Sequence, residues 1–133
     1  MGLKGEKVAQ VDTLVMADRI AVDRHQLSQL FTQLGEAGAE DVVLRAMEEL
    51  ALRLTHCEQL LRSQSLTDLR KCARSMIAIA EQVGMNTLAC VARDVTYCVD
   101  SGDPVALTAT TARLVRTGER SLSEIWDLQN LSL

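Results

Sequence analysis

The chain has 133 residues, of which 47% are hydrophobic and 24% are charged, and its formal net charge is −4. This length fits one domain with a buried core, and the composition argues against a disordered or fibrous chain. Its aromatic residues are only Phe31, Tyr97 and Trp126, and Pro104 is the one proline. Because strands favour aromatic and β-branched side chains, whereas Leu, Ala, Glu and Arg favour helices, the composition predicts an all-α fold.

The charge distribution argues against two classes of partner. The chain carries 14 Lys and Arg against 18 Asp and Glu, without a basic stripe or tail. We therefore expect no nucleic-acid binding, which needs positive charge clustered opposite the phosphates. No apolar run is long enough to span a membrane, and the N-terminal stretch lacks the apolar core of a signal peptide. These features predict a cytoplasmic protein without a membrane partner.

The cysteines do not form a recognisable motif. Cys57, Cys72, Cys90 and Cys98 are separated by 15, 18 and 8 residues. Zinc sites and redox motifs use closer pairs such as Cys-x-x-Cys. Since each cysteine lies within an apolar helical pattern, we expect four reduced thiols that are buried as small hydrophobic side chains.

The N-terminal third of the chain contains two predicted elements. Residues 1–22 include an apolar stretch without a clear cap, so we expect an extra helix or an extended arm there. Residues 23–133 would form the single bundle domain. Asp23 is a candidate N-cap of the next helix, whose apolar residues step by three and four. Gly35 and Gly38 are expected to end that helix.

Four amphipathic helices follow, in which apolar residues recur every three or four positions. Their apolar stripes cover residues 43–61, 66–83, 88–98 and 107–125. Short breaks separate the stripes. This pattern predicts an antiparallel up-down four-helix bundle, with the N-terminal helix or arm added to it.

Local signals mark the ends of these helices. Ser65 opens a sequence that resembles a capping box, and Asn86 is a candidate N-cap for the following helix. Gly84 is expected just after the end of one helix. Asp103, followed by proline, predicts the start of the last helix. Gly118 lies inside the last stripe and predicts either a close helix contact or a kink.

The residues that could support catalysis or metal binding are few. A di-metal bundle needs paired Glu-x-x-His motifs, and neither His25 nor His56 has a Glu three residues earlier. Neighbours in a helix point about 100° apart, so Cys57 and His56 cannot form a nucleophile pair. We therefore expect no metal, no cofactor and no enzymatic activity. A small enzyme would instead need an internal pocket lined by Cys57, Cys72 or His56.

Residues 68–85 resemble the active helix of histidine phosphotransfer (HPt) domains. That family pattern runs Leu-x-x-x-Ala-His-x-Leu-Lys-Gly-x-x-x-x-Leu-Gly. The positions that fit it are Leu69, Ala73 and Gly84, with Met76 and Val83 in place of two leucines. The spacing of the neighbouring helices extends the resemblance to roughly residues 35–125, and the resemblance implies an HPt-like four-helix bundle.

The chain departs from the family at the reacting residue. Arg74 occupies the position of the phosphoacceptor histidine, and Ile77 and Ala78 replace the Lys and Gly of the motif. A guanidinium stays protonated and has no free lone pair, so it cannot accept a phosphoryl group from an aspartyl phosphate. The resemblance therefore implies an HPt-like protein without phosphotransfer activity.

Without phosphotransfer, the resemblance still implies a surface that docks a partner protein. In the family, this helix contacts a receiver domain, which presents an acidic pocket. The corresponding partner-binding residues here are Arg70, Lys71, Arg74, Ile77, Ala78 and Glu81. Three of them form a basic cluster beside an exposed Ile77 and Ala78, which suits a protein contact. The alternative is an ordinary solvated helix face with one stray isoleucine.

Two functions follow from these patterns. The resemblance implies a non-catalytic adaptor or modulator in bacterial two-component signalling, which binds a receiver or histidine-kinase domain. The alternative is a structural or self-associating bundle, a homodimer without a signalling role. It is suggested by apolar residues in segments 8–22 and 125–133, which exceed what one four-helix domain needs.

Overall fold

The computed structural model describes residues 22–131, and the regular structure in that range is entirely helical. The helices are α2 (Arg24–Arg62), α3 (Leu66–Gln82), α4 (Asn86–Ser101) and α5 (Pro104–Leu131). The prediction of an all-α bundle is confirmed for this part of the chain. The predicted helix or arm over residues 1–22 lies outside the described residues, apart from the buried Val22.

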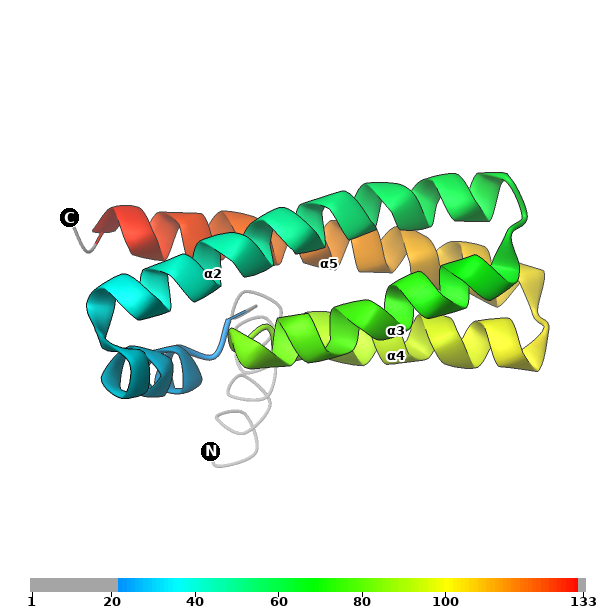
Figure 1. The fold of residues 1–133 in the computed structure, drawn as a ribbon. Helices are drawn as coiled ribbons and strands as arrows, with labels where there is room; N and C mark the ends of the chain where they lie inside the picture. Colours follow the sequence, from blue (N-terminus) through cyan, green and yellow to red (C-terminus); the bar gives the residue numbers. More distant parts are fainter. Residues whose placement is uncertain (1–21, 132–133) are drawn as a thin grey trace, which may run out of the picture.

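The four helices surround a shared core in cyclic order (Figure 1). Along the described chain, α2 contacts α3, α3 contacts α4, α4 contacts α5, and α5 contacts α2. The backbones of the diagonal pairs, α2 with α4 and α3 with α5, do not come close to each other in the same range. Among these helices, none combines the length and apolarity needed to cross a bilayer.

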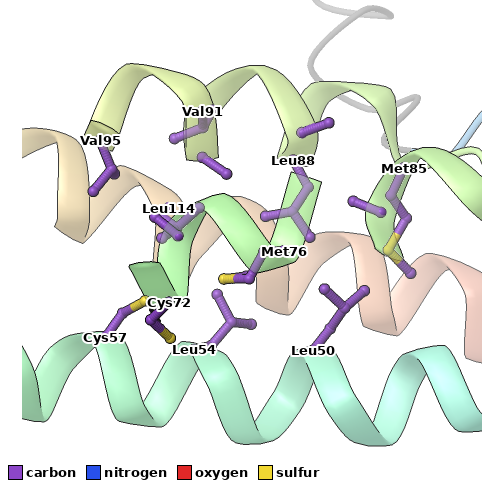
Figure 2. Close-up of a cluster of buried hydrophobic side chains, with 14 of the residues drawn as sticks. Leu50, Leu54, Cys57, Cys72, Met76, Met85, Leu88, Val91, Val95 and Leu114 are labelled. Carbon is purple, nitrogen blue, oxygen red and sulfur yellow. Dashed lines mark hydrogen bonds between the residues drawn. The ribbon is translucent and has the colours of Figure 1, made fainter. Parts of the chain in front are cut away.

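The core is made by the apolar stripes that the sequence pattern predicts. Figure 2 shows part of it, with side chains from all four helices meeting between the ribbons. Its largest fully buried side chains include Leu50, Leu69, Met76, Leu88, Leu114 and Ile125. Burial of one such side chain stabilises a fold by about 1.5–3 kcal/mol relative to leaving it exposed. The stripes therefore determine how each helix is turned about its own axis.

The helix α2 begins at a capped end and bends near its start. The Asp23 carboxylate accepts a hydrogen bond from the backbone N–H of Gln26 at 3.1 Å, which confirms the predicted N-cap. At Gly35 the backbone has φ +76° and ψ 168°, so the helical geometry is interrupted there. The prediction that Gly38 also ends a helix is wrong, because the backbone is interrupted at Gly35 alone. Figure 1 shows residues 24–34 beside the ends of the shorter helices α3 and α4.

The predicted caps of the later helices have mixed outcomes. Ser65 precedes α3, but its side chain makes no capping hydrogen bond, so the capping box is wrong. Asn86 is the first residue of α4 rather than its cap, which is Met85. Because Met85 is fully buried, apolar packing rather than a polar cap positions this helix start. Asp103 is confirmed as a cap, since its carboxylate accepts hydrogen bonds from two backbone N–H groups of α5.

Gly118 is the site of a close contact between α5 and α2. A Cβ atom at this position would overlap both methyl groups of Leu54, lying 2.7 Å from Cδ2. The helix α5 runs without a break from Pro104 to Leu131. Of the two predicted explanations for Gly118, close helix packing is therefore the correct one.

Gly84, in the connection between α3 and α4, packs against the start of α2. Its φ of +78° is the left-handed conformation expected just after a helix. Its carbonyl accepts a hydrogen bond from the backbone N–H of Asp23 at 2.7 Å. A Cβ atom on Gly84 would lie 2.8 Å from the backbone oxygen of Asp23, which leaves no room for a side chain.

We expect Gly84→Ala to destabilise the protein more than Gly102→Ala. Both glycines have a positive φ, but a Cβ at Gly102 would meet nothing within 4 Å. The control should lower the free energy of unfolding by about 1–2 kcal/mol through backbone strain alone. Gly84→Ala should cost at least about 1 kcal/mol more, because the backbone of Asp23 must move. Urea unfolding measures both changes, and equal losses would contradict the close contact.

Candidate functional site

Buried side chains on one side of α3 determine which of its residues face solvent. They are Leu69, Cys72, Ala73, Met76 and Ala80. On the remaining side, Lys71, Arg74 and Ala78 are exposed. We call these three residues the outer face of α3. They belong to the set that the sequence analysis assigned to partner binding.

The two cations of the outer face are unpaired. No ion pair within residues 22–131 involves Lys71 or Arg74. They are three residues apart, which places them on adjacent turns of the same helix face. The outer face therefore presents two full positive charges to solvent.

Arg70 and Glu81, the first and last residues of the predicted site, lie instead at the edge between α3 and α4. Both form ion pairs with residues of α4. Arg70 donates two hydrogen bonds to the Asp100 carboxylate, from Nε at 2.7 Å and from Nη2 at 3.0 Å. Arg93 of α4 forms an ion pair with Glu81. Of the predicted cluster of three basic residues, Arg70 therefore already has a carboxylate partner.

The Arg70–Asp100 pair also shifts the pKa of both of its members. The hydrogen bonds from the guanidinium, together with its charge, hold the pKa of Asp100 below its usual range. The same carboxylate raises the pKa of Arg70. The pair joins α3 to α4 across their exposed edge, so its contribution to stability depends on an ionised Asp100.

Ile77 is not the exposed hydrophobic residue that the sequence predicts. Its side chain is partly buried and packs against the core cluster. Ile77 lies seven residues after Arg70 and four before Glu81, so it shares their edge of the helix. The six residues of the predicted site are thus divided between that edge and the outer face.

A groove of about 400 Å³ lies between α3 and α2, on the other edge of α3. Its lining residues are Arg53, His56, Leu60, Asp68, Lys71, Cys72 and Ser75. The Arg53 guanidinium is held in place because its Nε donates to the Ser75 hydroxyl at 2.9 Å. Arg53 and Lys71 are the cations among the lining residues and Asp68 is the carboxylate, while Glu49 pairs with Arg53 from outside the lining at 3.8 Å.

Cys57 and Cys72 meet beneath this groove, with their sulfur atoms 3.3 Å apart (Figure 2). Cys57 is fully buried in α2, whereas Cys72 is 8% exposed and lines the groove. A hydrogen bond from Cys57 lowers the pKa of Cys72 to about 6, against the opposing effect of burial, and interactions with His56 and with the charge of Arg53 add to the lowering. That hydrogen bond and burial raise the pKa of Cys57.

Sequence reasoning missed this thiol pair and misplaced the other two cysteines. The four thiols are free, but Cys90 is exposed and Cys98 is half-buried, so the prediction of four buried cysteines is wrong. An apolar neighbourhood in the sequence does not determine which way one side chain of a helix points. A signal was nevertheless present, since Cys57 and Cys72 both belong to apolar stripes of consecutive helices.

Neither histidine lies on the outer face of α3. His56 is exposed at the groove, and His25 is exposed at the start of α2. The groove is open to solvent, and Cys57 is not among its lining residues. Within the described residues, no group of three or more His, Cys, Asp or Glu side chains is placed to hold a metal ion.

A second groove, of about 560 Å³, lies at the bent end of α2 beside the end of α5. Its apolar lining includes Leu27, Phe31, Val43, Ile125 and Leu128. None of the residues assigned to partner binding lines this groove. The unpaired cations and the thiol pair therefore centre the candidate site on α3.

The chain matches no protein-family model, no curated protein and no solved structure. Its function is accordingly inferred from the sequence pattern and from the geometry of α3.

We expect Asp100→Asn to destabilise the protein at neutral pH and to have little effect in strong acid. Asp100 has a lower pKa in the folded state than its unfolded value of about 3.9, so its contribution is present above that pH. The contribution is lost as the pH falls through the folded-state pKa. Urea midpoints of the two proteins should therefore converge as the pH falls below about 3.9.

The matched control for this experiment is Asp94→Asn. Asp94 is an exposed carboxylate of the same helix and has no ion pair within the described range. Its removal should leave the urea midpoint nearly unchanged at neutral pH. A loss as large as that of Asp100→Asn would show that net charge, not the pair with Arg70, is responsible.

Proposed function

We propose that this protein is a non-catalytic, HPt-like adaptor of bacterial two-component signalling. In this proposal it binds a receiver or histidine-kinase domain in the cytoplasm and transfers no phosphoryl group. The proposal includes an antiparallel up-down topology of the HPt-like type. Connections of only two or three residues between successive helices support that topology, as do the sequence colours in Figure 1.

The proposal rests on one observation, which is that Lys71 and Arg74 on the outer face of α3 form no ion pair within residues 22–131. Lys71 and Arg74 stand beside the small side chain of Ala78, which lets another surface approach the helix closely. The receiver domains bound by HPt proteins present an acidic pocket. Complementary charge increases association rates and selects partners, and Arg binds carboxylates through two parallel hydrogen bonds.

Arg74 supports binding without phosphotransfer. It occupies the position of the phosphoacceptor histidine in the HPt pattern, and its guanidinium stays protonated. His25 and His56 belong to α2, so neither takes the place of the missing histidine on α3. The proposed role of Arg74 is to enter or cover the acidic pocket of the receiver.

The edge between α3 and α4 has a supporting role in this proposal. Arg70 and Glu81 are each matched by a charge from α4, which leaves little net charge for a partner. Ile77 is partly covered at the same edge. We therefore narrow the predicted docking residues to Lys71, Arg74 and Ala78, with the edge residues holding α3 in its orientation.

Self-association is the alternative function. The large hydrophobic residues exposed within the described range are Leu34, Leu44, Leu52, Tyr97, Val105 and Trp126. They are distributed over α2, α4 and α5, and single exposed apolar residues are ordinary on monomeric proteins. Such scattered residues are weak support for a homodimer. The cations on the outer face of α3 are stronger support for docking.

Binding to a panel of receiver domains tests the proposed function. Each receiver is measured bare and with a phosphate mimic bound, by calorimetry on the full-length protein. We expect micromolar affinity for at least one receiver. Arg74→Glu should weaken that binding at least about tenfold, because it places a carboxylate against the acidic pocket.

The control is Arg113→Glu, which makes the same charge change on an exposed residue of α5, whose backbone does not come close to that of α3. It should leave the affinity nearly unchanged. Equal weakening by the two variants would contradict a role for the outer face. Silence from every receiver, together with a dimer in light scattering, would favour self-association instead.

A further inference from the structure

We propose that Cys72 and Cys57 form a peroxide-sensitive thiol pair, in which a peroxide oxidises Cys72 and Cys57 then joins it in a disulfide between α2 and α3. The proposal assigns a modification site and does not depend on the proposed docking function. It rests on the position of the two sulfur atoms, on the groove above them and on the charges around that groove.

The geometry brings the two thiols together and gives one of them access to solvent. The sulfur atoms are 3.3 Å apart, so a bond between them needs only small movements of the two side chains. Cys72 lines a groove of about 400 Å³, which has room for a molecule as small as hydrogen peroxide. Cys57 is fully buried and is reached through Cys72.

The charges around the groove give the two thiols different roles. A thiolate is the reactive form of cysteine, and nearby positive charge stabilises it. Arg53 and His56 line the groove beside Cys72 from α2, and Lys71 lines it from α3. The carboxylates that oppose these residues are Asp68 in the groove and Glu49, which pairs with Arg53 at 3.8 Å. The pKa of Cys72 is lowered to about 6, so Cys72 rather than Cys57 is the thiol that loses its proton more readily. Cys57 keeps its proton and donates a hydrogen bond to the sulfur of Cys72.

The proposed reaction has two steps. The Cys72 thiolate attacks one oxygen of hydrogen peroxide, the O–O bond breaks, and hydroxide leaves and takes up a proton to become water. Cys72 is then a sulfenic acid. The Cys57 sulfur gives up its proton and attacks the Cys72 sulfur, the S–O bond breaks, and the departing hydroxide is protonated to a second water. Together the two thiols lose two electrons, which reduce one peroxide.

The other two cysteines provide an internal comparison. Cys90 is exposed on α4, and Cys98 is half-buried near the Thr110 hydroxyl at 3.5 Å. Eight residues of one helix separate them, which corresponds to about 12 Å along the axis. They are therefore too far apart for a disulfide within one chain. Exposure alone would predict Cys90 as the first thiol to be oxidised.

The test uses the full-length protein treated with a small molar excess of hydrogen peroxide. Remaining thiols are alkylated, and the digest is mapped by mass spectrometry. We expect a linked Cys57–Cys72 peptide that dithiothreitol releases. The same linked peptide is expected from the Cys90→Ser/Cys98→Ser variant. The disulfide should raise the Tm by roughly 5–10 °C, because it constrains the unfolded chain.

Variants of one thiol and of the groove residues separate the roles of the two cysteines. Cys57→Ser should leave a sulfenic acid at Cys72 that dimedone traps. Arg53→Gln combined with His56→Gln should slow the oxidation of Cys72 roughly tenfold, as expected for a thiolate that has lost its stabilising charges. Circular dichroism checks that each variant is folded, and the peptide map of the unchanged protein decides the outcome if a variant is not.

Two results would overturn the proposal. One is oxidation of Cys90 while Cys57 and Cys72 stay reduced. The other is a Cys57→Ser protein in which dimedone labels Cys72 no faster than Cys90. Either result would mean that the thiol contact is a packing feature of the core.

Discussion

The orientation of α3 between α2 and α4 is the constraint on which every inference about this protein depends. Five residues of α3 are buried, and they fix its rotation about the helix axis. The rest of its surface is then divided into an edge toward α4, an outer face and an edge toward α2. A turn of α3 by one residue, about 100°, would bury Ala78 or expose Met76, so the packing energy of the core holds the three strips in place.

The features of the fold that depend on short-range patterns could be predicted from the sequence. The apolar period identifies the buried side of each helix, and the carboxylates of Asp23 and Asp103 cap helices through bonds to residues only two or three positions away. The failures arise where a tertiary contact competes with a local one. Met85 is buried by the core, so α4 starts at Asn86 without a polar cap.

The candidate site could be predicted only in part, for a similar reason. Lys71 and Arg74 fall outside the apolar stripe of α3, so their exposure follows from the sequence. Whether the charge of Arg70 has a partner depends instead on Asp100, thirty positions away on α4. The Cys57–Cys72 contact likewise depends on how far α3 is displaced along α2. Packing sets such displacements, as the fit of Leu54 against Gly118 does for α2 and α5.

The helix geometry also keeps the two proposed sites physically separable. Arg74 is two residues from Cys72, which places the two side chains about 160° apart around α3. A charge reversal at Arg74 therefore changes the outer face while leaving the thiol contact intact, and a serine at Cys57 alters the buried contact while leaving the outer face intact. Lys71 is the one residue that belongs to both strips. Any coupling between docking and oxidation would pass through the charge of Lys71 or through the orientation of α3 itself.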